Sequence, residues 1–247
     1  MLDRRQILIG SASLAAGASS SIGRAAAAPR PDGARASEAI YDYLFVEVLP
    51  GEGASTQKAF IDHLRGPGAA GVRAAGGEAL GYFTPLIGWT SQNIAVLLRW
   101  TDSVAGREKA VRAIQSHPAV AKSDRSRLAA TVRPAPTDLP RTTGIYTHRW
   151  FDVKTGDVPE FVDLSSRAWP SFEREFPAAI FGLFRAEALP QDHRRGVTRM
   201  LLNTQYESHA VWEASRKPSS EPTALFERRS QITLTTRVAS LHFTALA

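Results

Sequence analysis

Two short segments place chemically useful side chains at every second residue. The residues are Tyr41, Tyr43, Phe45 and Glu47 in the first segment, and Tyr146, His148, Trp150 and Asp152 in the second. Alternation of this kind brings side chains to one face of a β-strand. A histidine between an aromatic ring and a carboxylate can act as a general base, or bind haem iron or another metal. The catalytic candidates are therefore His148, Asp152 and Glu47.

Each candidate also has an ordinary structural interpretation. His148 could be a half-buried histidine that makes one hydrogen bond, which is the more frequent role. Glu47 and Asp152 could face each other as a carboxylate pair with a raised pKa, or could lie in water at the ends of their strands.

The same strands supply candidates for ligand binding. Tyr43, Phe45 and Trp150 belong to the aromatic face, which we expect to point into the protein interior. Arg149 has the opposite parity and would point at a helix layer, where its charge would need a partner.

Cofactor and metal motifs are sparse. No two of the six histidines have the H-x-x-x-H spacing of a metal-binding helix, so we predict no local metal site. The chain has no cysteine, which excludes disulfides, thiolate nucleophiles, Cys-ligated zinc, iron–sulfur clusters and covalently attached c-type haem. The cofactor is therefore unknown, and non-covalent haem is possible but not required.

The elements that position these residues occur twice along the chain. In residues 38–134 the pattern predicts strands over 43–48, 79–83, 94–100 and 129–133. Helices are expected around Phe60 to Leu64, ended by the Gly66-Pro67-Gly68 breaker, and over 107–114 and 119–128.

Residues 143–245 repeat this order. Strands are expected over 148–153, 180–184, 197–206 and 232–243. Asp157 and Glu160 form a predicted capping box for the first helix, and further helices are expected over 209–216 and 225–230. The proline-rich segment 135–142 is the predicted linker between the repeats.

Each repeat has the order β-α-β-β-α-β of a ferredoxin-like unit, which leaves one sheet face bare. Two such units can bury these faces against each other. We therefore predict an α+β fold in which two tandem ferredoxin-like repeats form a pseudo-dimeric α/β barrel. Two separate domains on a linker are the alternative, although each repeat is small for an independent domain.

Residues 1–27 resemble a twin-arginine export signal. Arg4 and Arg5 precede a mildly apolar stretch, and Ala25-Ala26-Ala27 offers small residues for a signal peptidase. We expect a mature chain from Ala28 that the twin-arginine machinery delivers to the periplasm or outside. An uncut membrane anchor, or a disordered tail with two chance arginines, are the alternatives.

Composition limits the partners. The chain has 247 residues and a net charge of +6, and loss of the leader removes three arginines and one aspartate, which leaves +4. The remaining arginines are scattered, so nucleic-acid binding is not expected. Residues 28–247 contain no run long enough to cross a membrane. A small-molecule ligand and a homo-oligomer are the expected partners.

A further pattern combines Arg149 in a first strand with the following residues: Tyr41, Pro50-Gly51, Tyr146, Phe151 before Gly156, Phe161, Trp169, Phe172 and 182–184. On these residues the chain resembles the NIPSNAP family of the dimeric α/β barrel superfamily, whose first strand contains an arginine that Arg149 matches. Phe151 replaces the family's tyrosine, Thr155 its proline, and Leu44 occupies the arginine position in the first repeat. The resemblance implies the fold, in a superfamily that contains haem enzymes, monooxygenases, isomerases and binding proteins.

These observations predict an exported protein that binds a small aromatic or apolar molecule in a barrel pocket. Cofactor-free oxygenation, isomerisation or haem chemistry are its possible activities. The alternative is a non-catalytic periplasmic binding or interaction module of the same fold. A buried His148 next to a carboxylate would favour an enzyme, and a filled apolar barrel would favour the alternative.

Overall fold

A computed structural model of the chain describes residues 39–51, 55–101 and 104–246; the predicted leader lies outside them. Eight strands form one closed barrel in the order β1-β3-β2-β8-β5-β7-β6-β4, and all neighbouring pairs are antiparallel. The strands are β1 (Ile40–Val48), β2 (Gly77–Ile87), β3 (Asn93–Trp100), β4 (Val120–Ala130), β5 (Ile145–Lys154), β6 (Ala178–Ala186), β7 (Val197–Tyr206) and β8 (Thr233–Ala245).

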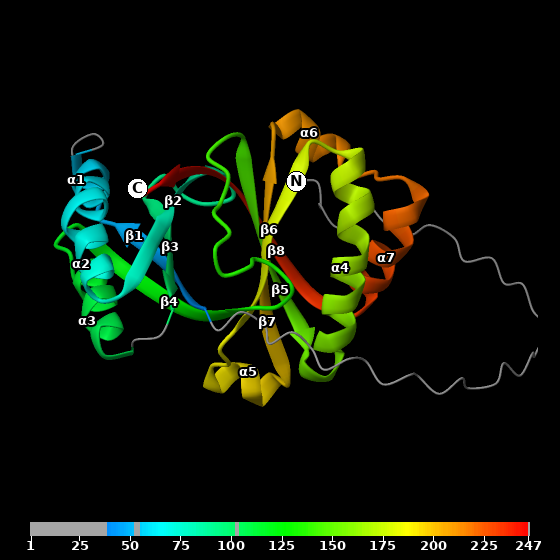
Figure 1. Cartoon of the computed structure of the whole chain (residues 1–247), viewed down its shortest axis with the longest axis horizontal. Helices are drawn as coiled ribbons and strands as arrows, with labels where there is room; N and C mark the ends of the chain where they lie inside the picture. Colours follow the sequence, from blue (N-terminus) through cyan, green and yellow to red (C-terminus); the bar gives the residue numbers. More distant parts are fainter. Residues whose placement is uncertain (1–38, 52–54, 102–103, 247) are drawn as a thin grey trace, which may run out of the picture. The chain divides into compact units, whose positions relative to one another are not determined.

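The helices lie outside the barrel, in one group for each repeat (Figure 1). The first group is α1 (Ser55–His63), the π-helical turn η1 (Leu64–Gly68), α2 (Ala69–Ala74) and α3 (Val104–Gln115). The second is the 3₁₀ turn η2 (Thr155–Asp157), α4 (Val158–Glu175), α5 (Pro190–Arg195), α6 (His209–Ala214) and α7 (Ser220–Gln231). None of the described helices is long and apolar enough to cross a membrane.

The two repeats share one sheet because their strands pair across the boundary. β2 pairs with β8 from Gly81↔Ala245 to Ile87↔Ser240, and β4 pairs with β6 from Leu128↔Ala186 to Ala130↔Phe184. Closure leaves no free strand edge. The predicted α+β fold of two ferredoxin-like repeats in a pseudo-dimeric barrel is confirmed.

Three apolar clusters follow from strand alternation. One lies between β1–β4 and α1–α3, a second between β5–β8 and α4 and α7, and a third fills the barrel interior. A central glycine in each second strand predicts a close approach of the backbone, and both glycines show one. A Cβ at Gly81 would lie 2.3 Å from the ring of Phe243, and one at Gly182 would lie 2.7 Å from Phe184. A register shift accompanies both glycines, at Ala79/Gly81 and at Ile180/Gly182.

Two element predictions in the first repeat are wrong. The segment 119–128 is strand β4 and not a helix, because it pairs with β1 from Ile40↔Ala129 to Val48↔Val120 and supplies the strand that links to β6. The predicted closing strand 129–133 accordingly ends at Ala130. The Gly66-Pro67-Gly68 breaker does not end the helix, since η1 contains it and α2 follows without interruption.

Predictions of helix starts had mixed outcomes. Asp157 makes no side-chain cap bond, and Glu160 instead accepts hydrogen bonds from Arg228, so the capping box is wrong. Polar residues ahead of two other helices, at 101–103 and at 207–208, also predict caps. Ser208 does cap α6, because its Oγ accepts the Val211 N–H at 3.3 Å. Residues 102–103 lie outside the described residues.

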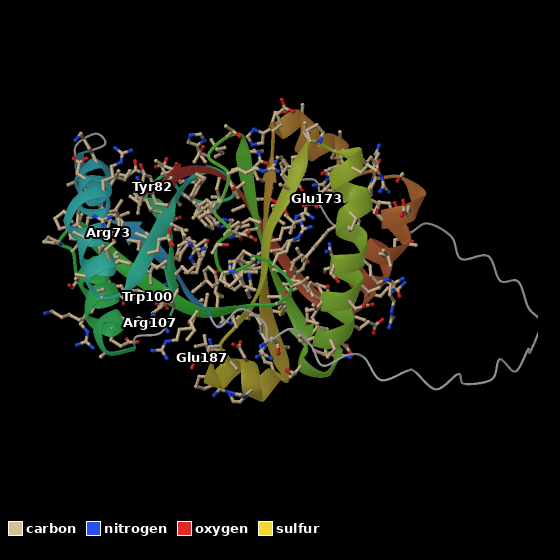
Figure 2. The ribbon with its side chains drawn as sticks, viewed as in Figure 1. Arg73, Tyr82, Trp100, Arg107, Glu173 and Glu187 are labelled. Carbon is tan, nitrogen blue, oxygen red and sulfur yellow. The ribbon has the colours of Figure 1, made fainter. Side chains whose placement is uncertain are left out.

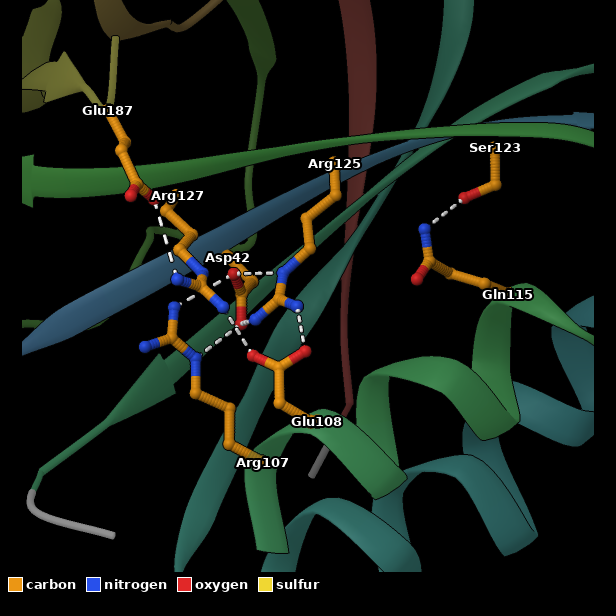
Figure 3. A network of polar contacts seen from close by, with 8 residues as sticks. All are labelled: Asp42, Arg107, Glu108, Gln115, Ser123, Arg125, Arg127 and Glu187. Carbon is orange, nitrogen blue, oxygen red and sulfur yellow. Dashed lines mark hydrogen bonds and ion pairs between the residues drawn. The ribbon is translucent and has the colours of Figure 1, made fainter. Parts of the chain in front are cut away.

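A buried ionic network joins β1, α3 and β4 on the outer face of the first repeat (Figure 3). Asp42 accepts hydrogen bonds from Arg107 at 2.8 and 2.9 Å and from Arg125 at 2.7 and 3.0 Å. Figure 2 labels Arg107 next to Trp100, and its guanidinium carbon lies 5.9 Å from the centre of that ring. Arg107 and Arg125 thus both have a carboxylate partner, which is the usual condition for burying an arginine.

Candidate functional site

The barrel centre contains His148, the leading candidate from the sequence. Its Nδ1 lies 2.9 Å from the Tyr43 hydroxyl, and its side chain is 1% exposed. The ring of Phe83 packs against it with centroids 4.3 Å apart. Burial lowers the pKa of His148 to about 3, so the imidazole is neutral at ordinary pH. A general base works best with a pKa near the operating pH, so this geometry favours a structural histidine.

Aromatic rings fill the barrel around His148. Tyr43 packs edge-on against Trp150 with ring centroids 5.6 Å apart, and Phe45 packs against Trp89 at 4.9 Å. Trp89 comes from the connection between β2 and β3. The predicted inward orientation of Tyr43, Phe45 and Trp150 is thus confirmed, but these rings pack mainly against one another.

The two acidic candidates have separate environments. Asp152 is buried and accepts hydrogen bonds from Arg195 at 2.9 Å and from Arg237 at 3.1 Å. Glu47 is exposed near the end of β1, on a strand that is not adjacent to β5. Asp152 is therefore an ion-pair partner of these two arginines, and among the described residues neither acid forms a hydrogen bond with His148.

Arg149 lies on the opposite face of β5 and lines a cavity of about 620 Å³ under α6 and α7, the outer cavity. Its other walls include Phe151 of β5, Thr236, Val238 and Ser240 of β8, and Trp212, Ser215, Phe226 and Arg229 of α6, α7 and the segment between them; the exposed Arg216 and Glu227 line it as well. A smaller inner cavity of about 30 Å³ lies deeper, against Trp169, Phe172 and Tyr206. Arg149, Ser215, Phe226 and Arg229 line both, so the two cavities adjoin; together they are the sheet–helix site.

Arg229 is the residue that the sequence analysis missed. Its side chain is 8% exposed, and its guanidinium carbon lies 4.8 Å from the ring centre of Phe226 and 5.4 Å from that of Phe151. Burial and the nearby charge of Arg149 lower its pKa to about 9. Arg229 follows Phe226 by three residues on α7, and this spacing on an apolar helix face is the signal that could have identified it.

The equivalent position in the first repeat is apolar. Leu44 takes the place of Arg149 and is fully buried in the apolar cluster under α1–α3. The two halves of the barrel have therefore diverged at this position: the described residues around Leu44 form an apolar cluster, and those around Arg149 line a cavity.

Two other features are weaker candidates. A cavity of about 930 Å³ lies beside the segment between β4 and β5, with a mixed lining that includes Arg133, Arg141 and Glu173. His63 and His117 stack with ring centroids 4.5 Å apart. Within residues 39–51, 55–101 and 104–246, no group of three or more metal-binding side chains forms.

Haem does not fit the sheet–helix site. Haem iron needs an axial donor such as histidine, cysteine, methionine or tyrosine. Of the two cavities in this site, only the outer one approaches the size of a cofactor, and its lining has none of these donors. Tyr206 of the inner cavity adjoins a space of only about 30 Å³. His148 faces the other side of β5, in the filled barrel.

Comparisons with known proteins support the fold. No protein-family model matches the chain, and no curated protein matches it by sequence. Among solved structures, a protein assigned as a monooxygenase from Lactobacillus acidophilus NCFM matches with a TM-score of 0.56 at 8% identity, over 85% of this chain and 97% of that one.

Two further structures give the same result. An anthrone oxidase-like protein has a TM-score of 0.56 at 14% identity, over 83% of this chain and 91% of its own. A mutant chlorite dismutase from Candidatus Nitrospira defluvii has a TM-score of 0.52 at 6% identity, over 85% and 93%. At such identities the likeness concerns the fold alone. The chain thus has the dimeric α/β barrel fold, with both ferredoxin-like repeats in one polypeptide.

Proposed function

We propose that this protein binds a small, mainly apolar or aromatic molecule in the sheet–helix site of its second repeat. The observation that carries the proposal is the outer cavity, whose volume of about 620 Å³ is within the range of about 300–1,000 Å³ for ligand pockets. Phe151, Trp212 and Phe226 give it aromatic walls, and Ser215 and Ser240 add a few polar groups. This combination is typical of small-molecule sites.

The sheet–helix site lies outside the barrel interior, where the sequence alone predicts the ligand. Aromatic side chains fill that interior, and the buried, neutral His148 forms no hydrogen bond or ion pair with a carboxylate of the described residues. A filled barrel of this kind favours a binding module over an oxygenase or isomerase acting through His148. Glu227, the only acidic residue in the lining, is exposed.

Blocking the mouth of the outer cavity tests the proposal. Thr236 is exposed on β8 and lines the cavity, so Thr236→Trp should fill the entrance without disturbing the core. We expect it to weaken ligand binding by roughly tenfold or more. Ligands can be found by native mass spectrometry of protein purified from its own cells and by thermal-shift screening of aromatic compounds.

Leu234→Trp is the matched control for this variant. Leu234 is 51% exposed, two residues away on the same face of β8, and outside the cavity lining. Binding should survive in the control and be lost in Thr236→Trp. Equal affinity in both variants would contradict a ligand in this cavity.

We further propose that the chain is an exported, NIPSNAP-like protein of the periplasm. Arg4, Arg5 and the alanines at 25–27 support export, and Arg149 with the aromatic positions supports the likeness. Replacing both arginines by lysine should retain the protein in the cytoplasm at its full mass. The unchanged chain should be recovered from the periplasm at the mass of residues 28–247. An unchanged distribution after the replacement would argue against the twin-arginine route.

A further inference from the structure

The polar atoms that remain without partners in the sheet–helix site are all hydrogen-bond donors. Arg149 Nε, Trp169 Nε1 and Trp212 Nε1 are buried and have no hydrogen-bond partner among the described residues. All three residues line the inner or the outer cavity. A buried N–H without an acceptor is costly, and no acceptor in the site lacks a partner in the same way. A ligand in this site is therefore expected to accept hydrogen bonds.

The charge of the site is also unbalanced. No described acidic side chain forms an ion pair with Arg149 or Arg229. Among the described residues, the Arg229 guanidinium donates one hydrogen bond, from Nη1 to Ser165 Oγ at 3.3 Å. Elsewhere, arginines that are buried or half-buried pair with acids: Arg99 with Glu78, Arg107 with Asp42, Arg133 with Glu173 and Arg199 with Asp192. The pair in the sheet–helix site is thus an exception within this molecule.

Two guanidinium groups of like charge in an apolar layer repel each other, and an anion between them would remove this cost. The planar fork of arginine donors fits the two oxygens of a carboxylate. The inner cavity of about 30 Å³ has room for a head group of that size, while the outer cavity can take a larger aromatic or aliphatic body. The small volume of the inner cavity and the positive charge of the two arginines therefore favour a compact anionic group in the inner cavity.

We propose that the ligand is an organic acid whose carboxylate lies between Arg149 and Arg229, with its apolar body in the outer cavity. This inference depends on the proposed function and names the chemical class of its ligand. The indole N–H of Trp169 lines the inner cavity as well and can complete the set of donors.

The test compares acids with their neutral amides. The probes are 2-naphthoate with 2-naphthamide and octanoate with octanamide, titrated into the full mature chain by calorimetry. Charge-assisted hydrogen bonds should make at least one acid bind about tenfold to a hundredfold more tightly than its amide. Arg149→Met and Arg229→Met should each abolish that preference while leaving amide binding within about threefold. Arg228→Met is the matched control, because Arg228 is the exposed neighbour on α7 that pairs with Glu160.

Thermal stability without ligand provides a second measurement. If Arg229 is retained for a ligand, Arg229→Met should raise the Tm of the free protein, because an unpaired buried charge is replaced by an apolar side chain of similar length. A lower Tm together with an unchanged acid preference would show that Arg229 serves only to stack on its aromatic neighbours, which overturns the inference.

The remaining outcomes separate the inference from the proposed function. Equal binding of acid and amide, lost in Thr236→Trp, would overturn the carboxylate assignment and leave the cavity as a ligand site. Failure of all four probes to bind at millimolar concentration would overturn the assignment of this ligand class; if screening with other aromatic compounds also failed, the proposed function would fall as well.

Discussion

Replacing Asp42 by alanine is expected to lower the free energy of unfolding by about 3–5 kcal/mol. Asp42 is fully buried on β1 and forms ion pairs with Arg107 and Arg125. Arg107 is also buried, so loss of the carboxylate would leave its positive charge in an apolar layer without its main partner. Chemical denaturation at neutral pH, followed by circular dichroism, measures the effect.

Two further variants make this prediction specific. Asp124→Ala removes an exposed acid next to Arg125 on β4, where it pairs only with the exposed Lys122, so a change below about 1 kcal/mol is expected. A triple variant with Asp42→Leu, Arg107→Met and Arg125→Met should recover much of the lost stability, because no charge is then left unpaired. A loss below 1 kcal/mol in Asp42→Ala would show that water or Glu108 replaces the carboxylate.

The sequence could predict the repeat and the barrel, but not this network. Alternation in 43–48 and in 148–153 identifies strands and their inner faces from local information alone. Asp42 precedes the run Leu44, Val46 and Val48 on the same face, and nothing local indicates that arginines 65 and 83 residues later meet it. The wrong prediction of a helix over 119–128 has the same origin. Pairing with β1 and β6 makes this segment a strand although its local pattern is helical.

The site was only partly predictable for related reasons. Arg149 was identified as a charge that would need a partner in the helix layer, and the structure places it there next to a cavity. Arg229 belongs to a helix whose other arginine, Arg228, is an ordinary surface residue. Which of two adjacent arginines faces the sheet depends on how α7 packs on β5 and β8, and sequence periodicity gives this only as a preference. The close packing of the barrel interior could not be predicted from the sequence either. Strand alternation indicates which side chains point inward, but it does not show whether they fill the space.

Acidification is expected to destabilise this protein through His148. The pKa of a histidine in an unfolded chain is about 6.5, whereas burial lowers that of His148 to about 3 in the folded protein. Between these values the unfolded state binds a proton that the folded state does not, so the free energy of unfolding falls as the pH falls. The loss from this residue should be about 2–3 kcal/mol between pH 6.5 and pH 4.5. His63 adds to it in the same direction, because burial and the charge of His117 lower its pKa as well.

His148→Gln isolates this contribution, because glutamine can still bond to the Tyr43 hydroxyl but does not titrate. The variant should be less stable than the unchanged protein at pH 7, and the difference should shrink or reverse by pH 4.5. His242→Gln, which removes an exposed histidine from the neighbouring strand β8, is the control and should follow the unchanged protein. Chemical-shift titration of the imidazole provides a direct check. If His148 protonates in the folded protein near pH 6, the barrel centre must admit water, and its imidazole would again be a candidate for proton transfer.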